Sequence, residues 1–279
     1  MKQDLRQRLP RRTEGLGVLA LALCLAIPAV ALGEEIRIGG SGAAIGTMRL
    51  LAEAFTERNP EIRITVAPNL GSAGGIRAVL AGAIGLAVTS RPMTESERKA
   101  GAVATEFART PFVFAVAAKS KRTAITTGEL ADIYAGTMVK WADGGTVRIV
   151  LRPTSDTDTD IVKSLSPEVR QAVETATKRP GVRVAVSDQD AADDLERIPG
   201  AIGPSSLALI LSEKRALRVL TLDGKEATTA AAATGSYPHH KRLFFVTGAR
   251  RSTEVEQFIA FVQSPAGREI LVRNGQWIP

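Results

Sequence analysis

The chain has 279 residues, which is enough for one large domain or two domains of moderate size. Its formal net charge is +7, and residues 34–279 carry 31 Lys and Arg against 27 Asp and Glu, or +4. Such a mild excess is not the signature of a nucleic-acid-binding protein, but it is compatible with an anionic ligand. Aromatic residues make up only 4% of the chain, so the core must rest on Val, Ile and Leu.

The N-terminus is typical of a secretory signal peptide. Basic residues within 2–12 precede an apolar run at 16–32, and Ala31-Leu32-Gly33 supplies the small residues of a cleavage site. The run is short for a transmembrane span, which argues against a membrane anchor. We therefore predict that residues 1–33 are removed before Glu34 and that the mature protein is exported.

The single cysteine, Cys24, lies inside this apolar run. A lipoprotein site there is disfavoured because Leu23 is bulky where a small residue is expected. Cleavage after Gly33 would remove Cys24, so no disulfide is expected in the mature chain despite its export.

Beyond the N-terminus, apolar strands alternate with amphipathic helices. After a first strand that begins at Ile36, strands are predicted at 62–67, 84–88, 106–118, 147–151, 182–186, 217–222 and 243–247. Helices are predicted at 47–58, 76–81, 158–164 and 191–198, after the capping boxes at 126–129 and 253–256, and from Pro265 to Gly275. This alternation predicts an α/β architecture, in which ligands bind beyond the carboxyl ends of the strands.

Small residues follow each of the first three strands, at 39–42, at 71–75 and at Thr89-Ser90. The first two segments are predicted loops that open helices. A helix N-terminus offers unpaired N–H groups and a partial positive charge, and both favour anions. A single anion site at the carboxyl ends of the strands is therefore expected.

The order and spacing of these motifs resemble the phosphate-type periplasmic solute-binding proteins of ABC importers, which have the type II periplasmic binding protein fold. The resemblance covers nearly the whole mature chain. The residues that carry it are Gly40-Ser41-Gly42-Ala43, Ala54-Phe55, Asn59-Pro60, Gly71-Ser72-Ala73-Gly74-Gly75-Ile76, Ser90-Arg91-Pro92, Ile133-Tyr134-Ala135-Gly136, Trp141, Arg152, Tyr237-Pro238, Leu243-Phe244-Phe245-Val246, Ser264-Pro265 and Gly275.

The resemblance implies two α/β lobes that close on the ligand like a hinge. Lobe 1 would comprise residues 34–113 and 243–279, and lobe 2 residues 114–242, joined by crossing strands at 112–117 and 243–246. It also implies a monomer without a cofactor or enzymatic activity. Such a protein captures a small oxyanion, with phosphate as the first candidate, and delivers it to the membrane permease of an ABC importer.

The resemblance further implies which residues contact the ligand. They are Ser41, Gly42, Ala44, Ile45, Ser72, Ala73, Thr89, Ser90, Arg152, Asp156, Thr157 and Asp158. Ala44 stands where the family has Thr, so only backbone N–H groups remain there. Ser90 falls near the family's carboxylate, and Arg152 matches its binding arginine.

The segment after Arg152 departs from the family. Asp156-Thr157-Asp158 replaces a Ser-Gly-Thr that holds the anion. An ionised carboxylate offers no donor, and two of them about 4 Å from a phosphate would cost several kcal/mol. Asp156 can help only if the ligand carries a proton that the carboxylate accepts. Alternatively, both acids serve as helix N-caps.

Other interpretations stay open or are disfavoured. Asp156, Asp158 and Asp160 alternate like the start of a calcium loop, but its later glycine and glutamate are missing, so no metal site is predicted. The only histidines are His239 and His240, which makes an acyl-transfer site improbable. Arg91 serves either as a ligand contact or as a structural salt bridge. A sensory adaptor, the same fold with an organic phosphate or carboxylate ligand, and a secreted hydrolase are the alternative functions.

Overall fold

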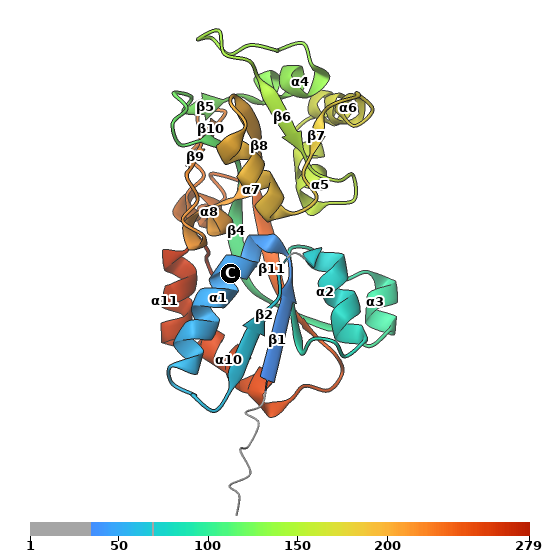
Figure 1. Ribbon diagram of the computed structural model, residues 1–279, viewed down its shortest axis with the longest axis vertical. Helices are drawn as coiled ribbons and strands as arrows, with labels where there is room; N and C mark the ends of the chain where they lie inside the picture. Colours follow the sequence, from blue (N-terminus) through green and yellow to red (C-terminus); the bar gives the residue numbers. More distant parts are fainter. Residues whose placement is uncertain (1–34, 69) are drawn as a thin grey trace, which may run out of the picture. The chain divides into compact units, whose positions relative to one another are not determined.

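The computed structural model describes residues 35–279 except residue 69. The predicted signal peptide lies outside the described residues. Within them, strands and helices alternate along the chain, so the predicted α/β class is confirmed (Figure 1). No helix in this part of the chain is both long enough and apolar enough to cross a membrane.

The helices and strands have the following bounds. The strands are β1 (Glu35–Gly40), β2 (Arg63–Val66), β3 (Leu86–Thr89), β4 (Val103–Ala117), β5 (Ala124–Ile125), β6 (Arg148–Leu151), β7 (Arg183–Val184), β8 (Ala201–Ser206), β9 (Leu217–Val219), β10 (Thr221–Leu222) and β11 (His240–Thr247). The helices are α1 (Gly42–Thr56), α2 (Gly71–Leu80), α3 (Glu95–Lys99), α4 (Thr127–Ala135), α5 (Thr157–Lys163), α6 (Pro167–Ala176), α7 (Asp188–Arg197), α8 (Leu207–Ser212), α9 (Thr229–Thr234), α10 (Thr253–Gln263) and α11 (Pro265–Arg273).

Two groups of parallel strands are joined by an antiparallel pair. The hydrogen-bonded order is β2-β1-β3-β11-β4-β8-β6-β7, and β9 also pairs with β4. Strand β1 is parallel to β2 and β3, and β6 is parallel to β7 and β8. Strands β4 and β11 are antiparallel to each other and to their neighbours β8 and β3. The parallel groups place the carboxyl ends of β1, β3 and β6 near the antiparallel pair.

The apolar residues form separate cores on the two sides of this pair. One core draws on residues 112–237, and the other draws on residues 36–108 and 243–271. Strand β4 contributes Phe107 to the second core and Phe112 to the first. Tyr237, just before β11, belongs to the first core and donates a hydrogen bond to the carbonyl oxygen of Phe112 at 2.8 Å. Both β4 and β11 therefore pass between the two lobes, where Thr110 pairs with Lys241.

The structure corrects several local predictions. Residues 71–75 are not a loop but the first turn of α2. The glycine at 75 allows close packing of this helix on β1, because a Cβ there would lie 2.9 Å from the Cα of Gly40. The cap of α10 is Ser252, one residue before the predicted Thr253. The predicted strand at 217–222 is divided into β9 and β10. The elements not predicted are α3, β5, α6, β8, α8 and α9.

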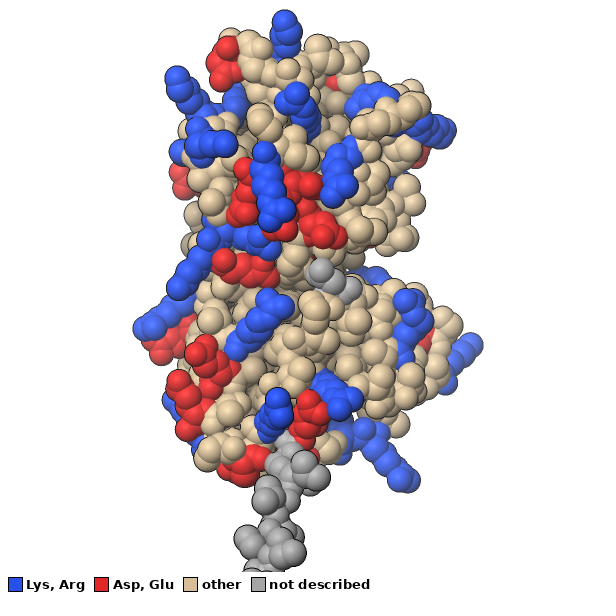
Figure 2. Space-filling view, in the orientation of Figure 1, with Lys and Arg blue, Asp and Glu red and all other residues tan. Residues whose placement is uncertain are grey.

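Positive and negative side chains are mixed over the face shown in Figure 2. This distribution accords with the mild net charge of the chain. Three charged residues of the described chain are buried instead: Arg152 after β6, Asp158 on α5 and Lys241 on β11.

Candidate functional site

A cavity of about 240 Å³ lies where the strand ends meet the helix N-termini. Its lining comes from the segments that follow β1, β3 and β6 and from the starts of α2 and α7. The lining residues are Ser41, Gly42, Leu70, Gly71, Ser72, Ala73, Gly74, Arg77, Ser90, Arg91, Arg152, Pro153, Ser155, Asp156, Thr157, Val186, Ser187 and Asp188. Segments far apart in the sequence thus converge on one polar site.

Eight of the twelve residues that the resemblance implied line this cavity. They are Ser41, Gly42, Ser72, Ala73, Ser90, Arg152, Asp156 and Thr157. Ala44, Ile45, Thr89 and Asp158 lie outside the lining.

Each of the four outlying residues has a structural reason for its place. Ala44 and Ile45 are buried inside α1, and the Ala44 N–H donates to the Ser41 carbonyl oxygen at 3.1 Å. Thr89 is fully buried, and its hydroxyl donates to the carbonyl oxygen of Arg91 at 3.0 Å. Asp158 is buried and turned toward β11. Local sequence could not show these directions, because each depends on packing.

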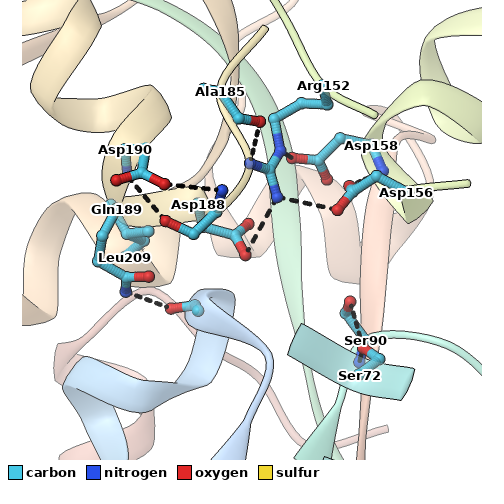
Figure 3. A network of polar contacts seen from close by, with 12 residues as sticks. Ser72, Ser90, Arg152, Asp156, Asp158, Ala185, Asp188, Gln189, Asp190 and Leu209 are labelled. Atoms are coloured by element: carbon cyan, nitrogen blue, oxygen red, sulfur yellow. Dashed lines mark hydrogen bonds and ion pairs between the residues drawn. The ribbon is translucent and has the colours of Figure 1, made fainter. Parts of the chain in front are cut away.

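One side of the cavity is built from hydroxyl groups at helix starts. Ser41 is the N-cap residue of α1, but its side chain makes no capping hydrogen bond among the described residues. Ser72, in the first turn of α2, accepts a hydrogen bond from the Ser90 N–H at 3.0 Å, and the two hydroxyl oxygens are 3.3 Å apart (Figure 3). These hydroxyls lie beside the positive ends of the α1 and α2 dipoles, where an anion is stabilised.

The other side of the cavity is dominated by Arg152, which directly follows β6. Its guanidinium donates through Nη1 to the Ala185 carbonyl oxygen and through Nη2 to Asp156 Oδ2, both at 2.8 Å (Figure 3). Nη2 also lies 3.7 Å from Asp188 Oδ2. Burial lowers the pKa of Arg152, but Asp188, Asp156 and Asp158 raise it above its ordinary value, so the guanidinium stays charged.

The two aspartates that depart from the family differ in their roles. Asp156 is the N-cap of α5 and accepts a hydrogen bond from the Asp158 N–H at 2.9 Å, so the capping interpretation is confirmed for Asp156. That interpretation is wrong for Asp158, whose carboxylate pairs with Lys241 instead. Asp156 also binds Arg152, so it combines capping with a place in the cavity wall.

Two charged residues of the site were missed from the sequence. Lys241 on β11 contacts the carboxylate of Asp158, and its Nζ lies 3.2 Å from Asp188 Oδ1. The predicted strand began only at Leu243, so Lys241 was placed outside it. For Asp188, the capping box of Ser187 and Asp190 would have located the start of α7. Nothing local would have paired either residue with Asp158.

Arg152, Asp156, Asp158, Asp188 and Lys241 form what we call the buried charge cluster. When all five are ionised, two cations face three carboxylates, and the cluster has a net charge of −1. Burial raises the pKa of Asp158 to about 7, with Asp188 and Asp156 adding to the rise and Lys241 opposing it. Although burial raises the pKa of Asp188, Lys241 and Arg152 bring it below its ordinary value.

Two further arginines border the cavity. Arg91 forms a double hydrogen bond with Glu97, at 2.9 and 2.6 Å, so it takes part in the salt bridge considered for it from the sequence. Arg77 is an exposed residue of α2 and also lines the cavity. Its charge adds to the positive field on the side of the hydroxyl groups.

Comparison with known proteins identifies the family. Residues 28–266 match the PBP superfamily domain. The chain belongs to this family. It is 24% identical over 247 residues to the phosphate-binding protein PstS of Borreliella burgdorferi, a match that covers 86% of this chain and 88% of that protein.

Solved structures similar to this PBP superfamily member show the same fold. A protein from Clostridium perfringens, described as a phosphate ABC transporter substrate-binding protein with bound phosphate, has a TM-score of 0.74 at 20% identity. That match covers 88% of this chain and all 100% of the other. An ABC-type phosphate transport receptor from Vibrio cholerae has a TM-score of 0.61 at 22% identity, with the same coverage of 88% and 100%. The predicted two-lobed periplasmic binding protein fold is thereby confirmed.

In this PBP superfamily domain, the cavity combines donors with acceptors. Hydroxyl groups, helix N-termini and Arg152 offer hydrogen-bond donors to an oxyanion, whereas the carboxylates of Asp156 and Asp188 can only accept while they are ionised. Both carboxylates line the cavity directly. Such a site suits a small polar ligand that carries negative charge and at least one proton.

Proposed function

We propose that this chain is a periplasmic solute-binding protein that captures inorganic phosphate and delivers it to the permease of an ABC importer. One observation carries the proposal. The buried Arg152 guanidinium shares one cavity with the hydroxyls of Ser41, Ser72 and Ser90. The similarity to proteins named for phosphate binding supports the same ligand.

The donors of the cavity match the needs of a tetrahedral oxyanion. Each phosphate oxygen accepts hydrogen bonds, and bonds from charged or oriented donors are the strongest. The N-termini of α1 and α2 add N–H groups and positive dipole ends next to Ser41 and Ser72. Arg152 supplies the full positive charge, and its Nη2 is the atom nearest to the cavity-lining carboxylates.

The carboxylates restrict the protonation state of the ligand. Asp188 Oδ2 lies 3.7 Å from Arg152 Nη2, outside hydrogen-bond distance, so it can accept a hydrogen bond from a ligand. A phosphate that retains a proton can donate to this oxygen, whereas a fully ionised oxyanion is repelled by it. We therefore propose protonated phosphate as the captured species, in preference to sulfate.

Lobe closure completes the proposed capture. Lobe 1 would comprise residues 34–113 and 243–279, and lobe 2 would comprise residues 114–242. The Gln189 side chain of α7 donates from Nε2 to the Gly42 carbonyl oxygen at the start of α1, at 3.1 Å, and so links the two sides beside the cavity. A ligand held by Ser72 on one side and Arg152 on the other would stabilise this closed arrangement. Secretion through the predicted signal peptide would place the protein in the periplasm. There it would act as a monomer.

A thermal-shift screen of residues 34–279 tests the proposed ligand. The panel holds phosphate, sulfate, nitrate, a small phosphate monoester and a dicarboxylate. A ligand at 100 times its Kd adds about 2.7 kcal/mol to the free energy of unfolding. We expect phosphate to give the largest shift. A larger shift with the monoester or the dicarboxylate would point to a different solute, and no shift with any anion would contradict a transport role for anions.

A further inference from the structure

We infer that anion capture at this cavity is coupled to the uptake of one proton by the buried charge cluster, and that Asp158 holds this proton. The inference rests on the proposed function, because it concerns the same cavity and an anionic ligand. The inference goes beyond the proposed function because it places a proton on the protein, on a residue behind those that line the cavity.

Charged groups surround Asp158 on several sides. Lys241 of β11 and Asp188 of α7 face it, as do Asp156 at the start of α5 and Arg152 after β6. Burial and the charge of Asp158 together raise the pKa of Tyr134 of α4. The side chains of Arg152, Asp158 and Lys241 are only 1–2% exposed, so water screens their interactions poorly. With every group ionised, the cluster carries one negative charge more than it can balance.

A bound anion changes the charge balance of the cluster. Asp156 and Asp188 line the cavity and belong to the same cluster, so a bound anion adds negative charge directly beside a cluster that is already negative. One proton from the solvent makes the cluster neutral, with Arg152 and Lys241 balanced by Asp156 and Asp188. Anion binding and protonation therefore favour each other, as any two linked binding events must.

Asp158 is the carboxylate of the cluster that takes the proton. Among the three carboxylates, Asp158 is the most buried, at 1% exposure against 12% for Asp188 and 25% for Asp156. Burial disfavours its charged form and already raises its pKa to about 7, while Lys241 and Arg152 hold Asp188 ionised. When Asp158 is protonated, Lys241 remains paired with Asp188 Oδ1 at 3.2 Å. The cluster thus keeps its geometry with one charge fewer.

Calorimetric titration of phosphate into residues 34–279, in buffers of different ionisation enthalpy, counts the protons taken up per ligand. At about pH 8 we expect an uptake between about 0.5 and 1 proton in the wild type. Asp158→Asn should reduce this number to near zero. Asp160→Asn is the matched control, because Asp160 is an exposed residue of the same helix, and it should behave like the wild type.

A second arm uses sulfate and needs no variant, so it stands even if Asp158→Asn fails to fold. Sulfate has no group that titrates near neutral pH, so any pH dependence of its affinity must come from the protein. We expect its affinity for the wild type to rise by up to about tenfold per pH unit as the pH falls from above 8 to about 7, and to level off below that, where Asp158 already holds its proton without a ligand. A flat pH profile, or proton uptake retained in folded Asp158→Asn, would overturn this inference and leave the proposed function standing. Absence of phosphate binding at every pH would overturn both.

Discussion

Lys241 and Asp158 form an ion pair although each side chain is only 1% exposed. Lys241 lies on β11, which passes between the lobes, and Asp158 lies on α5 beside the cavity. Removing two charges from water is costly, and their attraction repays that cost only when further polar groups support the pair. Asp188 provides this support, with its Oδ1 at 3.2 Å from Lys241 Nζ. Through Asp188, the pair therefore connects β11 to a residue that lines the cavity.

Removing Lys241 should destabilise the fold strongly. Lys241→Met removes the cation nearest to the carboxylates of Asp158 and Asp188 and leaves them only the longer contacts with Arg152, and breaking a buried pair in this way costs about 3–5 kcal/mol. Urea denaturation measures the free energy of unfolding. Lys225→Met, at an exposed position, is the control and should stay within about 0.5 kcal/mol of the wild type. If the two variants were equally stable, Lys241 would contribute nothing to the cluster.

The double variant Lys241→Met with Asp158→Asn distinguishes the interaction between the two charges from the effect of each substitution on packing. It removes one charge of each sign, so it should recover part of the stability that Lys241→Met loses. Strictly additive losses in this double-mutant cycle would contradict a direct interaction between the two side chains.

Arg152 should be essential for ligand affinity. Arg152→Ala removes the charged donor of the cavity and leaves Asp156 facing the ligand without its partner. Truncating one member of a buried charge pair costs about 2–5 kcal/mol, so phosphate affinity should fall at least about 30-fold. Arg148→Ala is the matched control, because Arg148 is an exposed residue of the strand that leads to Arg152. Affinity within threefold of the wild type in a folded Arg152→Ala variant would remove this residue from the site.

The cavity carboxylate of Asp156 should restrict which anions bind. Asp156→Ser replaces a group that repels ionised oxyanions with a hydroxyl donor, and serine can still cap α5. We expect the wild type to bind sulfate far more weakly than phosphate, and the variant to narrow this difference. Asp160→Ser serves as the control on the same helix. An equal sulfate-to-phosphate affinity ratio in the wild type and Asp156→Ser would place Asp156 outside the ligand shell.

The stability of the ligand-free protein should depend on pH through Asp158. Burial raises the pKa of Asp158 in the folded protein to about 7, from an ordinary value of 3.8. Between these values the folded chain holds a proton that the unfolded chain has lost. The contribution of Asp158 to stability is therefore complete below about pH 4 and is lost as the pH rises toward 7. In Asp158→Asn, urea denaturation between pH 4 and about 8 should show a flatter profile; an identical slope would rule out this effect.

Much of the fold could be predicted because it is encoded in local patterns. The capping box of Thr126 and Glu129 marks α4, and both of its predicted hydrogen bonds are present. Pro265 begins α11 as its fixed backbone angle suggests, with Ser264 as the cap. By contrast, β8 is buried along its whole length, so it shows no alternation of polar and apolar residues and did not stand out. Helix α6 was missed although Ser166 caps it and Pro167 begins it.

The site could be predicted only in part, for a physical reason. Ser72, Ser90 and Arg152 follow strands, and the carboxyl ends of strands in an α/β sheet converge on one edge. The partners of these residues are set by tertiary contacts instead. Lys241 reaches Asp158 because β11 returns to the middle of the sheet, and a single charged residue near a strand start gives no sign of that.

Isothermal titration calorimetry of phosphate into residues 34–279 at about pH 7 tests phosphate capture most directly. The cavity around Arg152 and Ser72 predicts saturable binding of one phosphate per chain. Absence of saturable binding up to about millimolar phosphate would contradict the proposed function.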